Sequence, residues 1–313
     1  MSPGPSSWSP TVNGSAAGLE KFRGVFPAIA TPMSPSGEEV DLDAIPRLCD
    51  FLIGKGVHGL FALGSTGEGV LLSLEERRSV AERVVASAGG RVPVIVNVGA
   101  LTTRDSLALA RHAAAIGADA LALVSPFYYR LTTDQQFAHY AAVLEAAGEL
   151  PVFLYNIPQA TGNTISLDIL QRLWDRFPNL AGIKDSSGNV PALQELLFSA
   201  PERLRVFVGE DLVDLVGLLL GAHGIVSSIS GVFPEPYVAL YEAVQRGELE
   251  LGKAAQKAIN ELVKCLTAAP HVAMCKEALA LRGVPVGPTR APIQLAHDVP
   301  REALRKALEI VAK

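Results

Sequence analysis

Residues 151–187 read PVFLYNIPQATGNTISLDILQRLWDRFPNLAGIKDSS, and this stretch contains the pattern from which most of the chain is built. It opens and closes with short apolar runs, which start at Pro151 and Leu180. Both runs are apolar throughout rather than alternating, which is typical of parallel strands covered on both faces. The segment between them has helical spacing. The stretch therefore predicts a strand, a helix and a second strand parallel to the first.

The same unit recurs along the chain, and we count eight apolar runs whose starts lie 20 to 35 residues apart. That distance is the length of one strand, one helix and two short loops. Ser73 and Glu76 have the spacing of a capping box at the start of one helix. Eight units predict a (β/α)8 barrel, an α/β fold. The alternative is a doubly wound open sheet, but no G-x-G-x-x-G follows the first run. The runs are GVFPAIATP from Gly24, GLFALGS from Gly59, PVIVNVG from Pro93, ALALVSP from Ala120, PVFLYNIP from Pro151, LAGIKDSS from Leu180, LRVFVGE from Leu204 and GIVSSIS from Gly224.

The chain divides into three predicted parts around this repeat. Residues 1–20 are rich in Ser, Pro and Gly and predict a flexible leader. Residues 21–232 contain the eight units of the barrel. Residues 233–313 predict the helix that closes the barrel and a helical C-terminal extension, whose last helix runs from about Arg301. We expect the extra helices to pack on the side of the barrel.

Composition excludes several classes of protein. A chain of 313 residues with 49% hydrophobic residues can bury a large core. Its net charge of −5 provides no basic surplus for a nucleic acid partner. Three cysteines without a CxxC pair indicate neither a disulfide framework nor a thiolate zinc site, so we expect a cytoplasmic protein. Six histidines without HxH or HExxH spacing indicate no metal, and no apolar segment is long enough for a membrane.

Polar residues at the ends of the predicted strands are the candidates for chemistry, because barrel active sites form there. Ser65 and Thr66 follow the second strand in a glycine-rich turn whose backbone N–H groups could bind a carboxylate. The alternative is a tight turn with small capping residues. Tyr128, Tyr129 and Tyr155 follow the fourth and fifth strands, where a buried tyrosine is more often core than catalyst.

Lys184 is the charged residue in the sixth apolar run. Asp185 is next to it in sequence, but adjacent side chains point to opposite faces of a strand. An unpaired buried ammonium is costly, which favours the neutral amine. A neutral lysine amine attacks ketones and forms Schiff bases. The alternative is a structural lysine held in a salt bridge.

Four motifs occur in order on the predicted strands: GSTGE at 64–68, SPFYY at 125–129, YNIP at 155–158 and GIKDSSGN at 182–189. With their spacing, the chain from about Gly24 to Pro292 resembles the dihydrodipicolinate synthase and N-acetylneuraminate lyase superfamily. The resemblance implies a class I pyruvate aldolase with no cofactor beyond the covalent lysine–pyruvate imine.

The resemblance also implies a role for each matching residue. Lys184 would be the Schiff-base lysine, and Tyr155 would shuttle protons to and from the bound intermediates. Ser65 would relay protons to Tyr155, and Thr66 would hold the pyruvate carboxylate. Tyr128 matches a tyrosine that reaches into the active site of a neighbouring subunit, which implies a homo-oligomer, most often a tetramer.

Departures from the family pattern bear on the substrate. Synthases of the lysine precursor carry an arginine after YN-x-P, where this chain has Gln159, and a tyrosine where it has Phe127. Sialic acid lyases use further acidic residues after the seventh strand, where this chain has Leu212. The expected substrate contacts are Gly64, Thr66, Gln159, Thr161, Glu210, Asp211, Val226 and Ser227 or Ser228.

These departures favour an aldolase for a 2-keto-3-deoxy sugar acid or a 4-hydroxy-2-oxo acid, made from pyruvate and an aldehyde. Four alternatives stay open: a 4-hydroxy-tetrahydrodipicolinate synthase that uses aspartate semialdehyde, a deoxy sugar acid dehydratase, an N-acetylneuraminate lyase, and a catalytically silent binding or regulatory barrel. The intact set of Lys184, Tyr155, Ser65 and Thr66 argues against the last.

Overall fold

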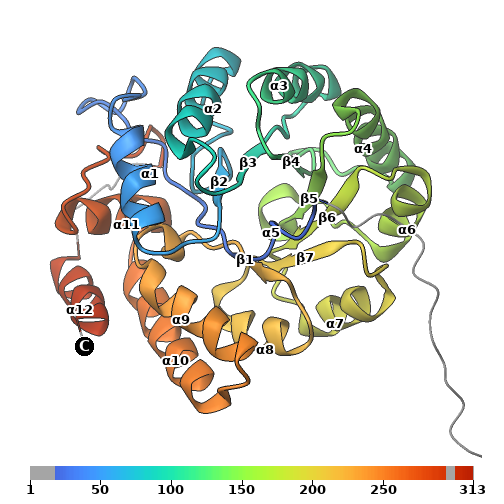
Figure 1. The fold of residues 1–313 in the computed structure, drawn as a ribbon. Helices are drawn as coiled ribbons and strands as arrows, with labels where there is room; N and C mark the ends of the chain where they lie inside the picture. The colour runs from blue at the N-terminus through green and yellow to red at the C-terminus, as the bar shows by residue number, and fades with distance from the viewer. Residues whose placement is uncertain (1–17, 294–299, 313) are drawn as a thin grey trace, which may run out of the picture.

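The computed structural model describes residues 18–293 and 300–312, and eight parallel strands form one sheet within them (Figure 1). Residues 1–17, most of the predicted leader, lie outside the described residues. Strands β2 to β8 pair in chain order, and β1 pairs with β8. The strands are β1 (Gly24–Val25), β2 (Leu60–Ala62), β3 (Val94–Asn97), β4 (Ala120–Val124), β5 (Val152–Asn156), β6 (Leu180–Asp185), β7 (Arg205–Val208) and β8 (Gly224–Ile225).

The sheet closes between the chain that follows β1 and strand β2. Ala28 forms a parallel bridge with Phe61. The Phe61 N–H donates to Pro27 O at 2.9 Å, and the Ile29 N–H donates to Phe61 O at 3.0 Å. All eight predicted strands are therefore present, and the predicted (β/α)8 barrel is confirmed.

The first and last strands are shorter than the predicted apolar runs. β1 ends two residues before Pro27, which has no N–H to donate to a ladder. After β8, the Ser227 hydroxyl accepts a hydrogen bond from the Ser230 N–H at 3.1 Å. A 3-10 turn, Ile229–Gly231, follows, and the last backbone bond to the chain after β1 is the one that Ser227 O accepts from the Ala28 N–H at 2.8 Å.

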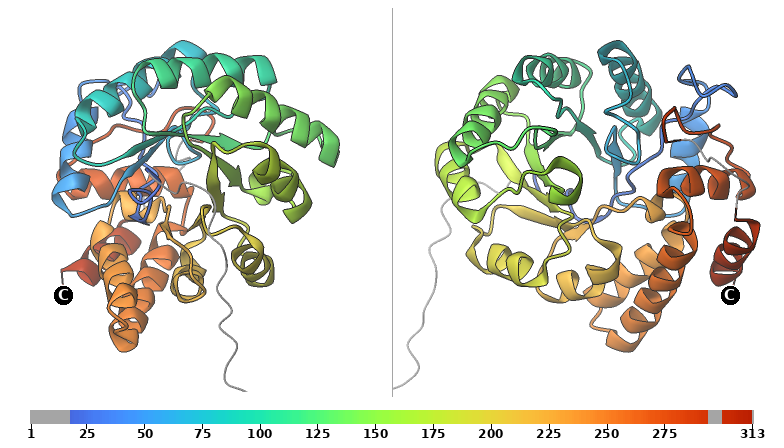
Figure 2. Two further views of the ribbon diagram at one scale, coloured as in Figure 1. Left: turned by 45° about the vertical axis from the view of Figure 1, so that its right-hand side comes forward. Right: turned by 180° about the vertical axis from the view of Figure 1, so that it is seen from behind.

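Helices surround the strands, and the last four gather on one side of the barrel (Figure 2). The predicted capping box is confirmed: Ser73 accepts from the Glu76 N–H, and the Glu76 side chain accepts from the Ser73 N–H. The helices are α1 (Ile45–Gly54), α2 (Leu74–Ala88), α3 (Thr103–Ala115), α4 (Thr133–Ala147), α5 (Pro158–Thr161), α6 (Leu167–Arg176), α7 (Val190–Ser199), α8 (Asp214–Leu219), α9 (Pro234–Gln245), α10 (Leu249–Leu266), α11 (His271–Leu281) and α12 (Arg301–Val311). Helix α9 follows residue 232 in the chain and packs on β1. The predicted boundary at residue 232, between the barrel and the C-terminal helices, therefore stays a prediction.

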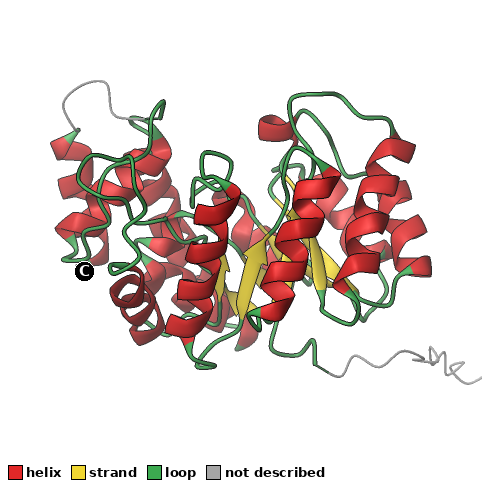
Figure 3. Ribbon diagram, turned by 90° about the horizontal axis from the view of Figure 1, so that it is seen from above, coloured by secondary structure: helices red, strands yellow, loops and turns green. Residues whose placement is uncertain are grey.

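Helices lie on both sides of the strands in the view of Figure 3. Apolar residues fill both the space between strands and helices and the interior of the barrel. Inside, the rings of Phe26 and Phe207 lie 5.1 Å apart, and those of Phe153 and Phe207 lie 5.6 Å apart. Both pairs meet edge to face, a favourable arrangement for aromatic rings. The interior is thus a packed core, which leaves the ends of the strands as the place for a site.

The register between β5, β6 and β7 places three inward-facing residues side by side. Tyr155 pairs with Lys184, and Lys184 pairs with Phe207. A register shift occurs earlier in the β5–β6 pair, between Val152 and Phe153. A slip of one residue moves a side chain to the other face of a sheet, so this shift decides which residue of β6 lies opposite Tyr155.

Candidate active site

Lys184 is buried at the end of β6, with 5% of its surface exposed. Its Nζ lies 4.0 Å from the centre of the Tyr155 ring and 4.6 Å from that of Phe61. None of the ion pairs found in residues 18–293 and 300–312 includes Lys184. Aromatic faces attract the ammonium form but leave the amine free to react. The alternative of a salt-bridged structural lysine therefore finds no partner in the described part of the chain.

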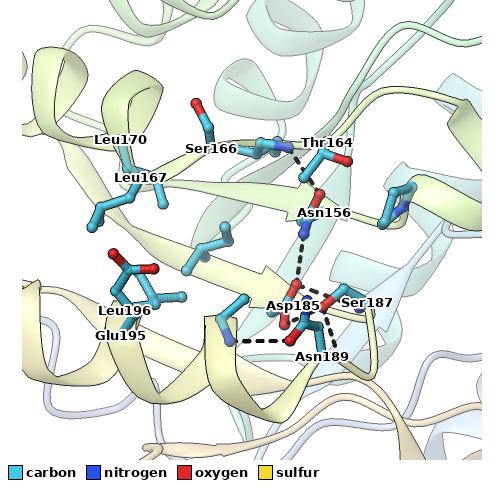
Figure 4. A pocket seen from close by; sticks show the side chains of 14 residues that line it. Asn156, Thr164, Ser166, Leu167, Leu170, Asp185, Ser187, Asn189, Glu195 and Leu196 are labelled. Atoms are coloured by element: carbon cyan, nitrogen blue, oxygen red, sulfur yellow. Dashed lines mark hydrogen bonds between the residues drawn. The ribbon is translucent and has the colours of Figure 1, made fainter.

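Asp185 faces away from Lys184, as the alternation of a strand predicts. Its Oδ1 accepts a hydrogen bond from Asn156 Nδ2 at 2.6 Å, and its Oδ2 accepts from the Ser187 hydroxyl at 2.8 Å. These groups line a cavity of about 410 Å³ between α6 and α7, on the helix-facing side of the strands (Figure 4). Asp185 thus belongs to the helix layer and not to the barrel mouth.

Tyr155 and Ser65 connect Lys184 to the turn after β2. The Tyr155 hydroxyl shares a hydrogen bond of 3.3 Å with the Ser65 hydroxyl. Tyr155 is buried, whereas Ser65 is exposed at the mouth and Thr66 is buried. A chain of two hydroxyls next to an amine can move a proton between the amine side of the site and the solvent.

A cavity of about 130 Å³ opens over Ser65 and Tyr155. That volume is smaller than the about 300 to 1,000 Å³ of sites for drug-sized ligands, so the space suits a small molecule. The cavity borders Tyr155 and the turn after β2 on one side and α5 on the other. Its lining is Gly64, Ser65, Val70, Asn97, Val124, Phe127, Tyr155, Ile157, Ala160 and Thr161.

The two candidate residues on α5 already have partners. Gln159 Nε2 donates to Ser186 O at 2.6 Å. The Thr161 hydroxyl lies 2.9 Å from Asn163 O and accepts from the Asn163 N–H at 3.2 Å. Gln159 therefore ties α5 to the end of β6, and Thr161 shapes the turn that lines the cavity.

Tyr128 lies outside this cavity, on the surface of the single chain. It is 83% exposed, and its backbone φ of +78° is in the left-handed region, which is unfavourable for a tyrosine. Its ring packs edge to face on that of Tyr129, at 5.0 Å. Of the three tyrosines at the strand ends, only Tyr155 lines this cavity of the single chain.

Carboxyl groups gather on the other side of Lys184, after β7. Tyr237 of α9 donates from its hydroxyl to Asp211 Oδ1 at 2.9 Å. Burial raises the pKa of Asp211, while hydrogen bonds from Ser227 and Tyr237 oppose this rise. Burial, and then the charge of Asp211, also raise the pKa of Glu210. The predicted contacts Glu210, Asp211 and Ser227 are therefore close together, and burial raises the pKa of both carboxyl groups.

Asp214 completes this acidic group and was not expected from the sequence. It is fully buried, and neither carboxyl oxygen has a hydrogen-bond partner among the described residues. Burial raises its pKa well above the ordinary range, and the charges of Asp211 and Glu210 raise it further. Val226, another predicted contact, is buried among the apolar side chains of the barrel interior.

Ser186 and Gly209 are two site residues that the sequence reasoning missed. Ser186 Oγ is buried and has no hydrogen-bond partner among the described residues. A Cβ placed on Gly209 would lie 2.1 Å from Ser186 Oγ and 2.8 Å from Lys184 Cε. Ser186 thus lies on the same side as Lys184, two residues along the chain, and Gly209 leaves space for both. The period of two in a strand could have indicated Ser186.

The structure provides no arrangement for a metal ion in the parts that it describes. In residues 18–293 and 300–312, no group of three His, Cys, Asp or Glu side chains is placed to hold one. Nor is any helix within these ranges long and apolar enough to cross a membrane.

Comparison with known proteins places this geometry among relatives. The sequence model described as the dihydrodipicolinate synthetase family matches residues 21–311. An uncharacterized DapA-like lyase of Halobacterium salinarum is 41% identical over 92% of this chain and 93% of its own. The structure of a catalytic lysine mutant of Ruminococcus gnavus sialic acid aldolase matches with a TM-score of 0.90 and 30% identity, over 94% of this chain and 97% of its own. The dihydrodipicolinate synthase of Acinetobacter baumannii, solved with pyruvate, matches with a TM-score of 0.87 and 32% identity, over 93% and 99% of the two chains.

Proposed function

The chain belongs to the dihydrodipicolinate synthetase family, and we propose that it is a class I aldolase or lyase that binds a 2-oxo acid, pyruvate in particular, on Lys184. The observation that carries the proposal is the environment of Lys184. Its amine is buried without a carboxylate partner in the described chain and lies against the ring of Tyr155. The matching sialic acid aldolase structure is of a catalytic lysine mutant, and the matching synthase structure contains pyruvate. Both support the same chemistry.

The reaction starts with attack of the neutral Lys184 Nζ on the keto carbon of the 2-oxo acid. The carbinolamine loses water to give an iminium ion, which withdraws electrons from the neighbouring carbon. Loss of a proton from that carbon gives an enamine, which adds to an aldehyde; in the reverse direction the C–C bond breaks. Hydrolysis of the imine then releases the product and frees the lysine.

Tyr155 transfers protons in these steps, and Ser65 extends its path. The Tyr155 hydroxyl is held by Ser65 at 3.3 Å, and the Tyr155 ring covers the lysine amine. Thr66, with its backbone N–H and that of the neighbouring glycine turn, binds the carboxylate of the 2-oxo acid. This arrangement needs no cofactor beyond the imine itself.

For the second substrate we propose an aldehyde that leads to a 2-keto-3-deoxy sugar acid or a 4-hydroxy-2-oxo acid. Glu210 and Asp211 follow β7, and Ser227 follows β8. The charge of Lys184 acts on Asp211, and Ser227 donates a hydrogen bond to it, so this group suits hydroxyl groups rather than a carboxylate. Gln159, where the synthases carry an arginine, cannot pair with a substrate carboxylate as a guanidinium does. A synthase, a dehydratase, an N-acetylneuraminate lyase and a silent barrel remain the competing functions.

Tyr128 leads to a proposal about assembly. An exposed aromatic side chain on a strained backbone needs surroundings that hold it. We propose that a second copy of the chain covers Tyr128, and that the protein is a homotetramer in the cytoplasm, where its three buried cysteines stay as free thiols. Light scattering after gel filtration measures the assembly, and a monomer at micromolar concentration would overturn this part.

The test of the main proposal traps the imine. The protein is incubated with pyruvate and sodium borohydride, digested and analysed by mass spectrometry. We expect a mass increase only on the peptide that contains Lys184, and none in Lys184→Ala. Lys253→Ala is the matched control, because that lysine is paired with Glu250 on an exposed helix face, and it should trap as the wild type does. Absence of an adduct in the wild type would contradict the Schiff base.

A substrate panel then separates the competing functions. Release of free pyruvate from a deoxy sugar acid indicates the aldolase, whereas loss of water without pyruvate indicates the dehydratase. Consumption of pyruvate with aspartate semialdehyde indicates the synthase, and cleavage of N-acetylneuraminate indicates that lyase. Trapping of pyruvate without turnover of any of these compounds would favour the silent barrel.

A further inference from the structure

A buried ion pair connects the turn that carries Ser65 and Thr66 to the C-terminal helices. Glu68, at the end of this turn, has its Oε1 2.5 Å from Lys276 Nζ of α11. The side chains of Glu68 and Lys276 are 0% and 1% exposed. An ammonium and a carboxylate at this distance form an ion pair. A pair without solvent is screened little by salt and is costly to break from one side.

Further hydrogen bonds complete the connection on both sides of the pair. Glu68 Oε2 accepts from the Arg290 N–H at 2.7 Å, and Lys276 Nζ donates to Pro288 O at 2.8 Å. Each partner of the ion pair thus holds the same C-terminal segment, 288–290. The turn after β2, helix α11 and this segment form one connected unit.

The turn needs such support because its backbone is strained. Leu63 and Glu68 have φ values of +62° and +53°, in the left-handed region. A Cβ on Gly69 would lie 2.2 Å from Leu63 O, so the two ends of the turn approach closely. Each such residue costs on the order of 1–3 kcal/mol and persists only where its surroundings over-determine it. The buried contacts of Glu68 provide this constraint.

Arg290 holds the chain that follows the turn. Its guanidinium makes two bonds with the Glu76 carboxylate, at 2.7 and 2.9 Å, and one with Leu71 O at 3.3 Å. Glu76 also caps α2 through Ser73. Segment 288–290 therefore contacts both the turn after β2 and helix α2, which follows the turn.

We propose that Lys276 is a positioning residue, which acts through Glu68 to hold Ser65 and Thr66 in place for the carboxylate of the 2-oxo acid. This inference rests on the proposed function of the same site. Lys276 lies 92 residues after Lys184 in the sequence and on a helix outside the barrel units. The helical extension therefore contributes to substrate binding and not only to the side wall of the barrel.

The test compares Lys276→Met with Arg282→Met. Arg282 comes directly after α11 and pairs at 2.5 Å with Glu235 of α9 rather than with the turn. We measure the pyruvate concentration that gives half-maximal borohydride trapping, the trapping rate at saturating pyruvate, and the melting temperature. We expect Lys276→Met to raise the half-maximal concentration about tenfold, a loss of roughly 1.4 kcal/mol of carboxylate binding, with a smaller change in the saturating rate. Arg282→Met should lower the melting temperature and leave the half-maximal concentration unchanged.

Glu68→Gln and the double variant Glu68→Gln/Lys276→Met cover the case in which the single lysine variant does not fold. The double variant leaves no unpaired charge, so it should melt at a higher temperature than Lys276→Met. Its half-maximal concentration should be no higher than that of the worse single variant, because both changes break one contact. Folded variants that bind pyruvate as the wild type does would overturn the positioning role. Failure of the wild type to trap pyruvate would instead overturn the proposed function.

Discussion

Gly209→Ala should disable Lys184 with little effect on the fold. Gly209 follows β7, and its N–H donates to Asp185 O at 2.8 Å on the neighbouring strand. A new Cβ would lie 2.1 Å from Ser186 Oγ, whereas ordinary contacts begin at 3.4 Å. The same Cβ would lie 2.8 Å from Lys184 Cε. Both side chains must therefore move away from the strand that places them.

The size of the effect follows from these distances. Ser186 Oγ must move by about 1.3 Å and Lys184 Cε by about 0.6 Å to reach ordinary contact. Overpacking of this kind costs about 1–3 kcal/mol of stability. A misplacement of about 1 Å in a site costs roughly 100-fold in rate. We expect the rate of imine trapping with pyruvate to fall by that order, and the melting temperature to fall by only a few degrees.

Two variants control for a general loss of packing. Gly217→Ala places a Cβ 2.3 Å from Val208 Cγ2, in the helix layer of the same β7–α8 unit. It should destabilise the protein by a similar amount and trap pyruvate normally. Ser186→Ala in the Gly209→Ala background removes the closest clash and should restore part of the rate. The reasoning is refuted if Gly209→Ala traps pyruvate at the wild-type rate.

Two further predictions concern Tyr155 and Asp214. Tyr155→Phe should keep the fold and the trapped adduct but slow turnover by about 10² to 10⁴, the usual contribution of a positioned acid or base; steady-state assays with equal turnover would remove Tyr155 from the mechanism. Asp214 has a raised pKa, so the folded state binds more protons than the unfolded state and wild-type stability falls as pH rises from about 4. Asp214→Asn should therefore raise the melting temperature at pH 8 more than at pH 5, and an equal change at both would contradict the buried neutral acid.

The fold could be predicted because its signals are local. Each strand is a short apolar run followed by a helix, and the eight runs repeat at similar distances. Side chains cap the N-termini of α2, α3, α4, α6 and α7. Lys184 could be found for the same reason, since a charge in such a run conflicts with its surroundings. The lengths of β1 and β8 could not, because Pro27 and the 3-10 turn Ile229–Gly231 interrupt the apolar runs at places that periodicity does not mark.

The sequence by itself determined the barrel, the position of Lys184 at the mouth and the neighbouring residues Tyr155, Ser65 and Thr66. Tertiary structure alone decided which groups meet there. The register shift opposite Val152 brings Lys184 beside Tyr155, and Gly209 leaves room for the lysine. Glu68 meets Lys276, which lies 208 residues later in the chain. Such contacts depend on packing between segments that are far apart in the sequence, whereas periodicity and capping depend only on near neighbours in the chain.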